Sequence, residues 1–289
     1  MTVYCYTTKP ECPTLFGIAA AGARVVPIQQ AGPVAIMPSP GDVAYFRAAY
    51  ETQLDSPLTI AAVALADAVV LGGGEGRVRV VNHPRHIAAA QVKWCAYSML
   101  KAAGFSVPAY IVQPTYAEAV ISCEHCWPVI VRQADGSTGR NMRICHNRAM
   151  LMAAIQAMQD ARLRYMLVSY VDTRLEGTTK FHRRRAWIIG DKVDHHNVLT
   201  SSQWIISDVG RRLRNPDLPP EAEHQLTMIG RVLGLESYSV DFVCGTGHDS
   251  DTPKIMVFDV NPTYWYVPAK DDGHLVRLVE WLRSKEIPA

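Results

Sequence analysis

The segment from residue 256 to residue 262 constrains the fold of this chain more than any other. Its first four residues are typical of a β-strand, and alternation along a strand places Asp259 and Asn261 on the same face. A carboxylate and a carboxamide at this spacing offer hard oxygen ligands to one Mg²⁺. Pro262 cannot continue a central strand, so we expect the pair at a strand end. The alternative is a plain strand that ends in a turn.

A second carboxylate strengthens the metal-binding interpretation. Asp241 lies inside the otherwise apolar strand-like run 238–244. Burying a carboxylate in such a run is costly unless it is paired or bound to a metal ion. A hairpin between this run and the next would bring Asp241 beside Asp259 and Asn261, as ligands for one or two ions.

The order of the elements predicts a mixed α/β chain. Short β-rich runs alternate with helical segments over residues 1–83, which favours a small unit with a parallel sheet. One helix is expected over residues 87–103. The strands expected beyond it cover residues 109–113, 128–132, 142–145, 166–171, 182–189, 192–199, 237–244 and 255–260, with helices over 116–122, 149–158, 219–233 and 274–285.

Phosphate-binding features lie between these metal ligands and the first unit. The loop of Gly136, Ser137, Thr138 and Gly139 lies between two expected strands, and its backbone N–H groups can hold phosphate oxygens. A hairpin turn is the alternative. Lys93, early in a helix, and Arg132, at a strand end, can both neutralise phosphates, although such residues are often solvated surface charges.

In order and spacing, these features resemble the ATP-grasp superfamily, and most closely its RimK-type amino-acid ligases. The resemblance covers roughly residues 42–285. It rests on matches to the family's spacing: Asn82, Lys93, Gly104 and Pro108, the strand and glycine loop of 128–139, the strand 166–171, Arg185 five positions before Gly190, and Asp241 followed by Asp259 and Asn261.

The resemblance implies a fold in three parts with ATP between the last two. The three implied parts are an N-terminal α/β domain (1–83), a lid (108–171) and a central domain with an antiparallel sheet (172–289), and a connecting helix (84–107) joins the first two. The implied cofactors are ATP and Mg²⁺, with one or two ions and Mn²⁺ as a substitute. The implied reaction is carboxylate–amine ligation: ATP phosphorylates a carboxylate, and an amine attacks the acylphosphate.

The resemblance also implies roles for single residues. Lys93, Arg132, the glycine loop and the backbone of Ser169 and Val171 would contact ATP. Arg185 would act on the transferring group, and alternation places Arg183 on the same face. Substrate contacts are expected from Arg47 to a carboxylate and from Tyr264 and Trp265 to an acceptor, unless the two aromatic residues pack against the closing helix. His195 or His196, on the partner strand, could also face the site.

The chain departs from the family pattern at several positions. Arg132 replaces a lysine, Asp259 replaces a glutamate, and Ser169 stands where a glutamate is usual. An arginine and an asparagine are missing around residues 204–208, and residues 263–266 replace a small serine-proline-glycine type sequence. Two other functions therefore stay open beside the ligase: a phosphotransferase that acts on a hydroxyl, and a nucleotide-binding protein without ligation activity.

Composition limits the partners. The net charge of +2 does not favour nucleic acid or a membrane surface, and no apolar run reaches the length of a membrane span. The N-terminus lacks a signal-peptide pattern, so we expect a cytoplasmic protein. The resemblance implies small-molecule or peptide substrates and a homodimer or homotetramer. The seven cysteines fit reduced thiols, and Cys123 and Cys126 form either a turn or a zinc or redox pair.

Overall fold

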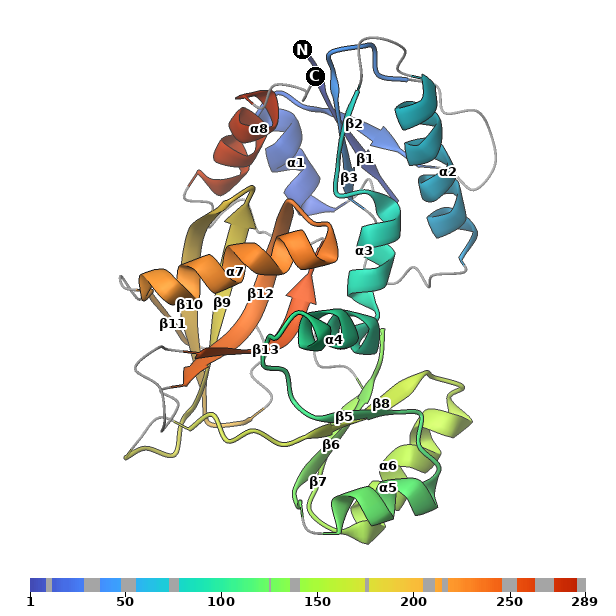
Figure 1. Ribbon diagram of the computed structural model, residues 1–289, viewed down its shortest axis with the longest axis vertical. Helices are drawn as coiled ribbons and strands as arrows, with labels where there is room; N and C mark the ends of the chain where they lie inside the picture. Colours follow the sequence, from blue (N-terminus) through green and yellow to red (C-terminus); the bar gives the residue numbers. More distant parts are fainter. Residues whose placement is uncertain are drawn as a thin grey trace.

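The structure is a computed structural model in which three β-sheets follow one another along the chain (Figure 1). It describes residues 1–8, 12–28, 37–47, 56–72, 78–124, 126–135, 141–174, 177–204, 211–214, 218–245, 254–262 and 273–284. The predictions for six residues concern positions outside these ranges: Gly136, Ser137, Thr138, Gly139, Tyr264 and Trp265.

The N-terminal sheet has the order β2-β1-β3-β4, and all its strands are parallel, as the alternation of elements predicted. Its elements are β1 (Val3–Thr7), α1 (Pro13–Ala20), β2 (Arg24–Pro27), β3 (Val43–Arg47), α2 (Pro57–Gly72) and β4 (Arg79–Val81). Side chains alternate between two cores: Tyr6 and Phe46 pack with α2, whereas Cys5 and Tyr45 pack with α1.

The expected helix over residues 87–103 is two helices, α3 (Pro84–Gln91) and α4 (Lys93–Ala102). Val92 between them is extended, with φ −81° and ψ 105°. The break leaves the Lys93 N–H outside the helical ladder, and it donates instead to the carbonyl of Ala134 at 2.8 Å. A backbone contact from the lid therefore stabilises an interruption that the local sequence does not signal.

The second sheet belongs to the region predicted as the lid, and its strands are antiparallel in the order β5-β8-β6-β7. Its elements are β5 (Tyr110–Val112), α5 (Tyr116–Cys123), β6 (Val129–Gln133), β7 (Met142–Cys145), α6 (Arg148–Asp160) and β8 (Tyr165–Ser169). The two helices cover one face. On the other face Ile130 and Met166 pack against Tyr97 of α4, which lies between this sheet and the next (Figure 1).

The third sheet is antiparallel, in the order β11-β10-β9-β12-β13. Its elements are β9 (Phe181–Ile189), β10 (Lys192–Ser201), β11 (Arg211–Arg214), α7 (Pro220–Leu233), β12 (Ser237–Gly245) and β13 (Lys254–Asn261), followed by α8 (His274–Ser284). The edge strand β11 was not expected. Helix α7 packs on one face, and α8 packs near α1 on the N-terminal sheet (Figure 1).

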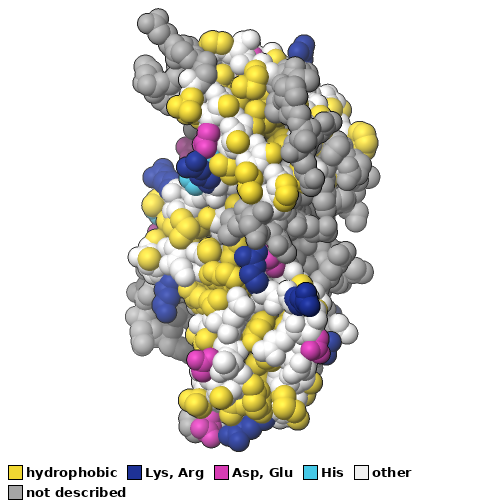
Figure 2. All heavy atoms as spheres, turned by 90° about the vertical axis from the view of Figure 1, so that its right-hand side faces the viewer, with side chains coloured by type: hydrophobic (Ala, Val, Ile, Leu, Met, Phe, Trp, Pro, Cys, Tyr) yellow, Lys and Arg dark blue, Asp and Glu magenta, His cyan; other side chains and the backbone are white. Residues whose placement is uncertain are grey.

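Helix α2 carries an unusually apolar outer surface. Asp67 is its only charged residue among sixteen, while Ile60 and Leu71 are 59% and 84% exposed. Figure 2 shows hydrophobic side chains spread over the upper part of the molecule, on the side where α2 lies. Among the described helices, none has both the length and the apolar character needed to cross a bilayer.

Candidate functional site

Four polar side chains form a row across the third sheet. The strand register places Asn197 opposite Arg185, Arg185 opposite Asp241, and Asp241 opposite Asp259. Directly opposed residues of antiparallel strands share a face, so this row lies on the face that α7 does not cover. The predicted metal ligands and the predicted catalytic arginine are therefore brought together by strand pairing.

Asp241 is the centre of this row and is 1% exposed. Its two carboxylate oxygens accept hydrogen bonds from Arg185, from Nε at 2.6 Å and from Nη2 at 3.0 Å, and Arg183 Nη1 lies 3.2 Å away. Burial alone would raise the pKa of Asp241, but the charges of Arg183 and Arg185 outweigh it and lower the pKa to about 2. Asp241 is therefore ionised at neutral pH.

Asp259 forms a buried ion pair with Lys93, whose side chain is 5% exposed. A β-bulge precedes Asp259: Asp241 pairs with Asp259 while Phe242 pairs with Val257, which leaves Phe258 as the extra residue. The Phe258 carbonyl accepts hydrogen bonds from Tyr97 Oη at 2.6 Å and Arg132 Nη1 at 3.5 Å. The bulge thus joins the candidate metal strand to α4 and to the lid.

Asn261 lies two positions beyond Asp259, opposite Ser239, and is 8% exposed. Asn82 fixes this end of β13; the sequence resemblance had matched Asn82 to the family by its spacing alone. Its Nδ2 donates to the Ser237 carbonyl at 2.6 Å and the Pro262 carbonyl at 3.3 Å. Its Oδ1 accepts from the backbone N–H of Ser237 at 3.1 Å. Asn82 therefore ties β4 to the ends of β12 and β13.

The second sheet contributes Arg132, near the end of β6. Its Nε is buried and has no hydrogen-bond partner among the described residues. The Lys93 N–H, at the start of α4, bonds to Ala134, two residues beyond Arg132. Two cations thus lie beside the chain that enters the predicted glycine loop, and an unsatisfied guanidinium N–H at this position suits a phosphate oxygen.

Ser169 and Val171, which were predicted to contact ATP through their backbone, are held by hydrogen bonds of their main-chain groups. The Ser169 N–H donates to the Ala109 carbonyl at 2.8 Å, and the Val171 carbonyl accepts from Trp204 Nε1 at 2.8 Å. The Trp204 ring also contacts Tyr170, with centroids 5.6 Å apart. Trp204 therefore fixes the chain just beyond β8. Trp204 itself lies where the sequence departs from the family pattern.

Arg47 lies at the end of β3 and is 6% exposed. Its Nη1 donates to Cys12 Sγ at 3.2 Å. Burial would raise the pKa of Cys12, but Arg47 and Thr14 outweigh this effect and lower it. The guanidinium that was predicted to bind a substrate carboxylate is thus held by a cysteine that the sequence reasoning did not consider.

The arrangement fits Mg²⁺ and a nucleotide. Asp241 and Asp259 are opposed on neighbouring strands, and Asn261 follows on the same face, so two carboxylates and one carboxamide are neighbours on this face. This is a hard oxygen donor set of the kind that Mg²⁺ prefers. Sequence reasoning named His195 as a residue that could face the site, but it missed Tyr97 and the other members of the Asp194 cluster, which consists of Asp194, His195, His274 and Arg277. Both omissions depend on contacts between residues distant in the chain.

Solved structures with similar folds were found, although no protein-family model matches the sequence and the comparison with curated proteins finds no relative. The ATP-grasp ligase PsnB, complexed with a precursor variant, Mg and ADP, is 15% identical, with 98% of each chain covered and a TM-score of 0.67. D-cycloserine synthetase DcsG is 13% identical over 97% of this chain and 98% of its own, with a TM-score of 0.65. An ATP-grasp RimK domain protein from Sphaerobacter thermophilus is 15% identical over 98% of this chain and 97% of its own, with a TM-score of 0.61.

These similarities show the fold. The chain has the ATP-grasp fold over nearly its whole length, which confirms the fold class predicted from the sequence.

Proposed function

We propose that this chain, which has the ATP-grasp fold, is an ATP- and Mg²⁺-dependent carboxylate–amine ligase that forms an amide or peptide bond through an acylphosphate. The observation that carries the proposal is the group of three cations and two carboxylates at the junction of α4 and the third sheet. Lys93 pairs with Asp259, and Arg183 and Arg185 pair with Asp241. Such a group suits phosphoryl transfer, in which charge stabilisation and positioning supply most of the catalysis.

The chain's own residues have distinct roles in this proposal. Asp241, Asp259 and Asn261 would hold Mg²⁺, which supplies charge neutralisation at the phosphates when bound. Lys93 and Arg132 would bind phosphate oxygens from opposite sides, one from α4 and one from β6. We extend the proposal to the glycine loop and to the backbone of Ser169 and Val171 as the remaining ATP contacts.

Arg185 is proposed to stabilise the charge that develops during transfer. Its guanidinium lies beside Asp241 in the row and is held in a bidentate pair with that carboxylate, which fixes the orientation of the guanidinium plane. Arg183, two residues before Arg185 on the same face of β9, contacts the same carboxylate. The lid would exclude water that otherwise hydrolyses the acylphosphate.

The substrates are proposed to be a small-molecule or peptide carboxylate and an amine. PsnB is described in complex with a precursor peptide, and DcsG as a D-cycloserine synthetase. The proposal includes self-association as a homodimer or homotetramer, supported by the exposed apolar surface of α2. Light scattering coupled to size-exclusion chromatography measures the mass directly.

The test is a product assay. The protein is incubated with ATP, Mg²⁺ and pooled carboxylates and amines, and ADP, AMP and phosphate are followed. Amine-dependent release of ADP together with phosphate supports ligation. ADP without phosphate points to a phosphotransferase, and AMP with pyrophosphate excludes the acylphosphate route. An absence of nucleotide binding by calorimetry refutes the proposal altogether.

A further inference from the structure

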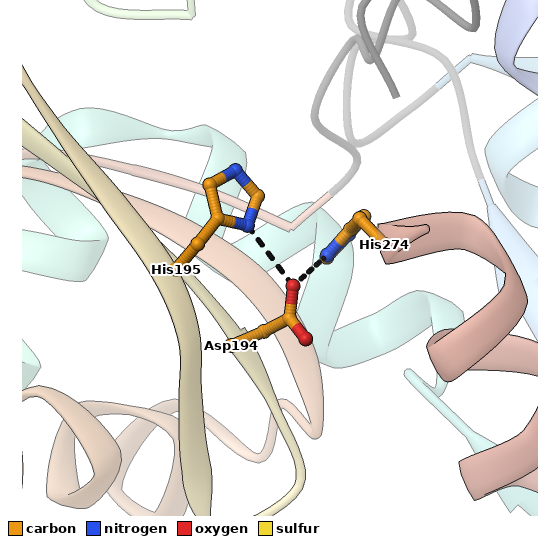
Figure 3. A group of neighbouring side chains, drawn as sticks. All are labelled: Asp194, His195 and His274. Carbon is orange, nitrogen blue, oxygen red and sulfur yellow. Dashed lines mark hydrogen bonds and ion pairs between the residues drawn. The ribbon is translucent and has the colours of Figure 1, made fainter. Parts of the chain in front are cut away.

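A second polar cluster lies on the same face of the third sheet, beyond the row that contains Arg185. Asp194 is a bulge residue of β10, and one of its carboxylate oxygens, Oδ2, contacts His195 Nδ1 at 2.9 Å and His274 Nδ1 at 2.6 Å (Figure 3). Arg277 reaches both oxygens, with Nε at 2.5 Å from Oδ1 and Nη2 at 2.8 Å from Oδ2. The cluster joins β10 to the first turn of α8.

The protonation of this cluster follows from the charge of Asp194. Burial alone would raise the pKa of Asp194, but hydrogen bonds from Arg277, His195 and His274 outweigh it and hold the pKa far below its usual range. An ionised carboxylate only accepts hydrogen bonds, so Nδ1 of His195 must donate. When the ring is neutral, the proton therefore lies on Nδ1, and Nε2 is the basic nitrogen. Figure 3 shows Nε2 pointing away from Asp194.

One aspartate and two histidines this close also suggest a metal site. The hydrogen bonds argue against that interpretation. Both histidines direct Nδ1–H groups at the carboxylate rather than lone pairs at a common point, and Arg277 already supplies the positive charge. A divalent cation at this position would have to displace these donors while lying beside a guanidinium.

His195 lies next to the proposed transfer centre. It pairs across the strands with Trp187, whereas Arg185, two positions along β9, pairs with Asn197. Its ring stacks on Trp187, with centroids 4.3 Å apart and planes at 11°, and its side chain is 16% exposed. His195 and Arg185 are thus diagonal neighbours, at about 7–8 Å between backbone positions, a separation that two long side chains bridge directly or through one water.

We propose that His195 is the general base that deprotonates the incoming amine, with Asp194 as the positioning residue that fixes its tautomer. This inference rests on the proposed ligase function and supplies a group that phosphoryl transfer alone does not require. The amine nitrogen attacks the carbonyl carbon of the acylphosphate and forms the C–N bond. The C–O bond to phosphate breaks, phosphate leaves with the electron pair, and the proton lost by nitrogen goes to Nε2 of His195.

The charged groups around His195 agree with this role. The Nδ1 side of the His195 ring faces Asp194 of the same strand, which in turn is held by His274 and Arg277 from α8. From β9, Arg185 contributes a positive charge that is already paired with Asp241. A carboxylate behind the ring fixes its tautomer and orientation, as in other histidine–carboxylate pairs.

The experiment separates the two half-reactions by the choice of nucleophile. Hydroxylamine traps acylphosphates as hydroxamates without needing an enzymatic base, whereas the amine that supports turnover in the product assay needs one. We compare His195→Gln with the wild type for both. The variant should form hydroxamate at nearly the wild-type rate, while amine-dependent product falls by about 10²- to 10⁴-fold.

The matched control is His196→Gln. His196 lies on the same strand but on the opposite face, beside Ala186, so its variant should change neither rate. Asp194→Asn should lower the ratio of amide to hydroxamate, which a purely structural role would leave constant.

Equal loss of both products in His195→Gln, or loss of neither, overturns the assignment while leaving the ligase proposal intact. A wild type that forms no hydroxamate overturns the ligase proposal and this inference with it.

Discussion

The stability of Asp241→Asn, measured without nucleotide or Mg²⁺, tests whether the negative charge of Asp241 stabilises the folded protein by pairing with the arginines around it. In a site built only of carboxylates, removing one negative charge relieves repulsion and stabilises the metal-free protein. Here Asp241 is 1% exposed and is held by Arg183 and Arg185. We therefore expect the opposite sign: the asparagine leaves two arginines without their counter-ion, and the protein becomes less stable.

The magnitude follows from the pKa of Asp241, which is lowered from 3.8 to about 2. One pKa unit corresponds to about 1.4 kcal/mol, so the charged form contributes roughly 2 kcal/mol to the free energy of unfolding. Because the folded-state pKa is depressed, this contribution is fully present above pH 3.8 and is lost as the pH falls through about 2. The variant lacks it at every pH.

The assay is urea unfolding followed by circular dichroism at neutral pH and at successively lower pH. The difference between wild type and Asp241→Asn should be about 2 kcal/mol at neutral pH and should shrink in strongly acidic solution. Asp191→Asn, in the exposed turn between β9 and β10, is the control and should leave stability unchanged. Equal or greater stability of Asp241→Asn at neutral pH would refute the charge-pairing argument.

Three further predictions concern the same site. Arg185→Ala should lower kcat by about 10²-fold or more, because it removes stabilisation of developing charge; an effect confined to KM would reduce its role to binding. Asp259→Asn should lower turnover by a similar factor of about 10², because the proposed Mg²⁺ site loses a ligand; near-normal rates with Mg²⁺ would contradict the metal assignment. Asn82→Gly removes the hydrogen bonds to Ser237, while glycine tolerates the observed φ of +53°. The free energy of unfolding in urea should fall by about 3 kcal/mol, and an unchanged midpoint would contradict this.

The pairing that brings the candidate metal ligands together could be predicted because its information is local. Asp259 and Asn261 are two positions apart before a proline, and Asp241 interrupts an apolar run, so alternation and the cost of burial suffice to bring them together. The register that opposes Asp241 to Asp259 confirms that the two runs pair as expected. The bulge at Phe258 was not predictable, because its carbonyl is used by Tyr97 and so depends on a distant helix.

Other features escaped prediction for the same physical reason. The break at Val92 is stabilised by the Ala134 carbonyl, and Asp194 meets His274 across eighty positions of sequence. Neither contact leaves a spacing that a reader of the sequence can detect. The strand β11 was missed because it consists mainly of arginines, and pairing with β10 rather than apolar alternation makes it a strand.

The charge pairs of the site bear on how the ligands enter it. Without nucleotide, Lys93 neutralises Asp259, and two arginines neutralise Asp241, so neither carboxylate is free to bind a cation at low cost. In the proposed function, a triphosphate would attract the same lysine and arginines, because they form strong charge-assisted hydrogen bonds with phosphate. Each cation that turns to a phosphate would leave a carboxylate available to Mg²⁺. The proposal therefore predicts that nucleotide and metal binding are coupled through an exchange of partners among residues that are already in place.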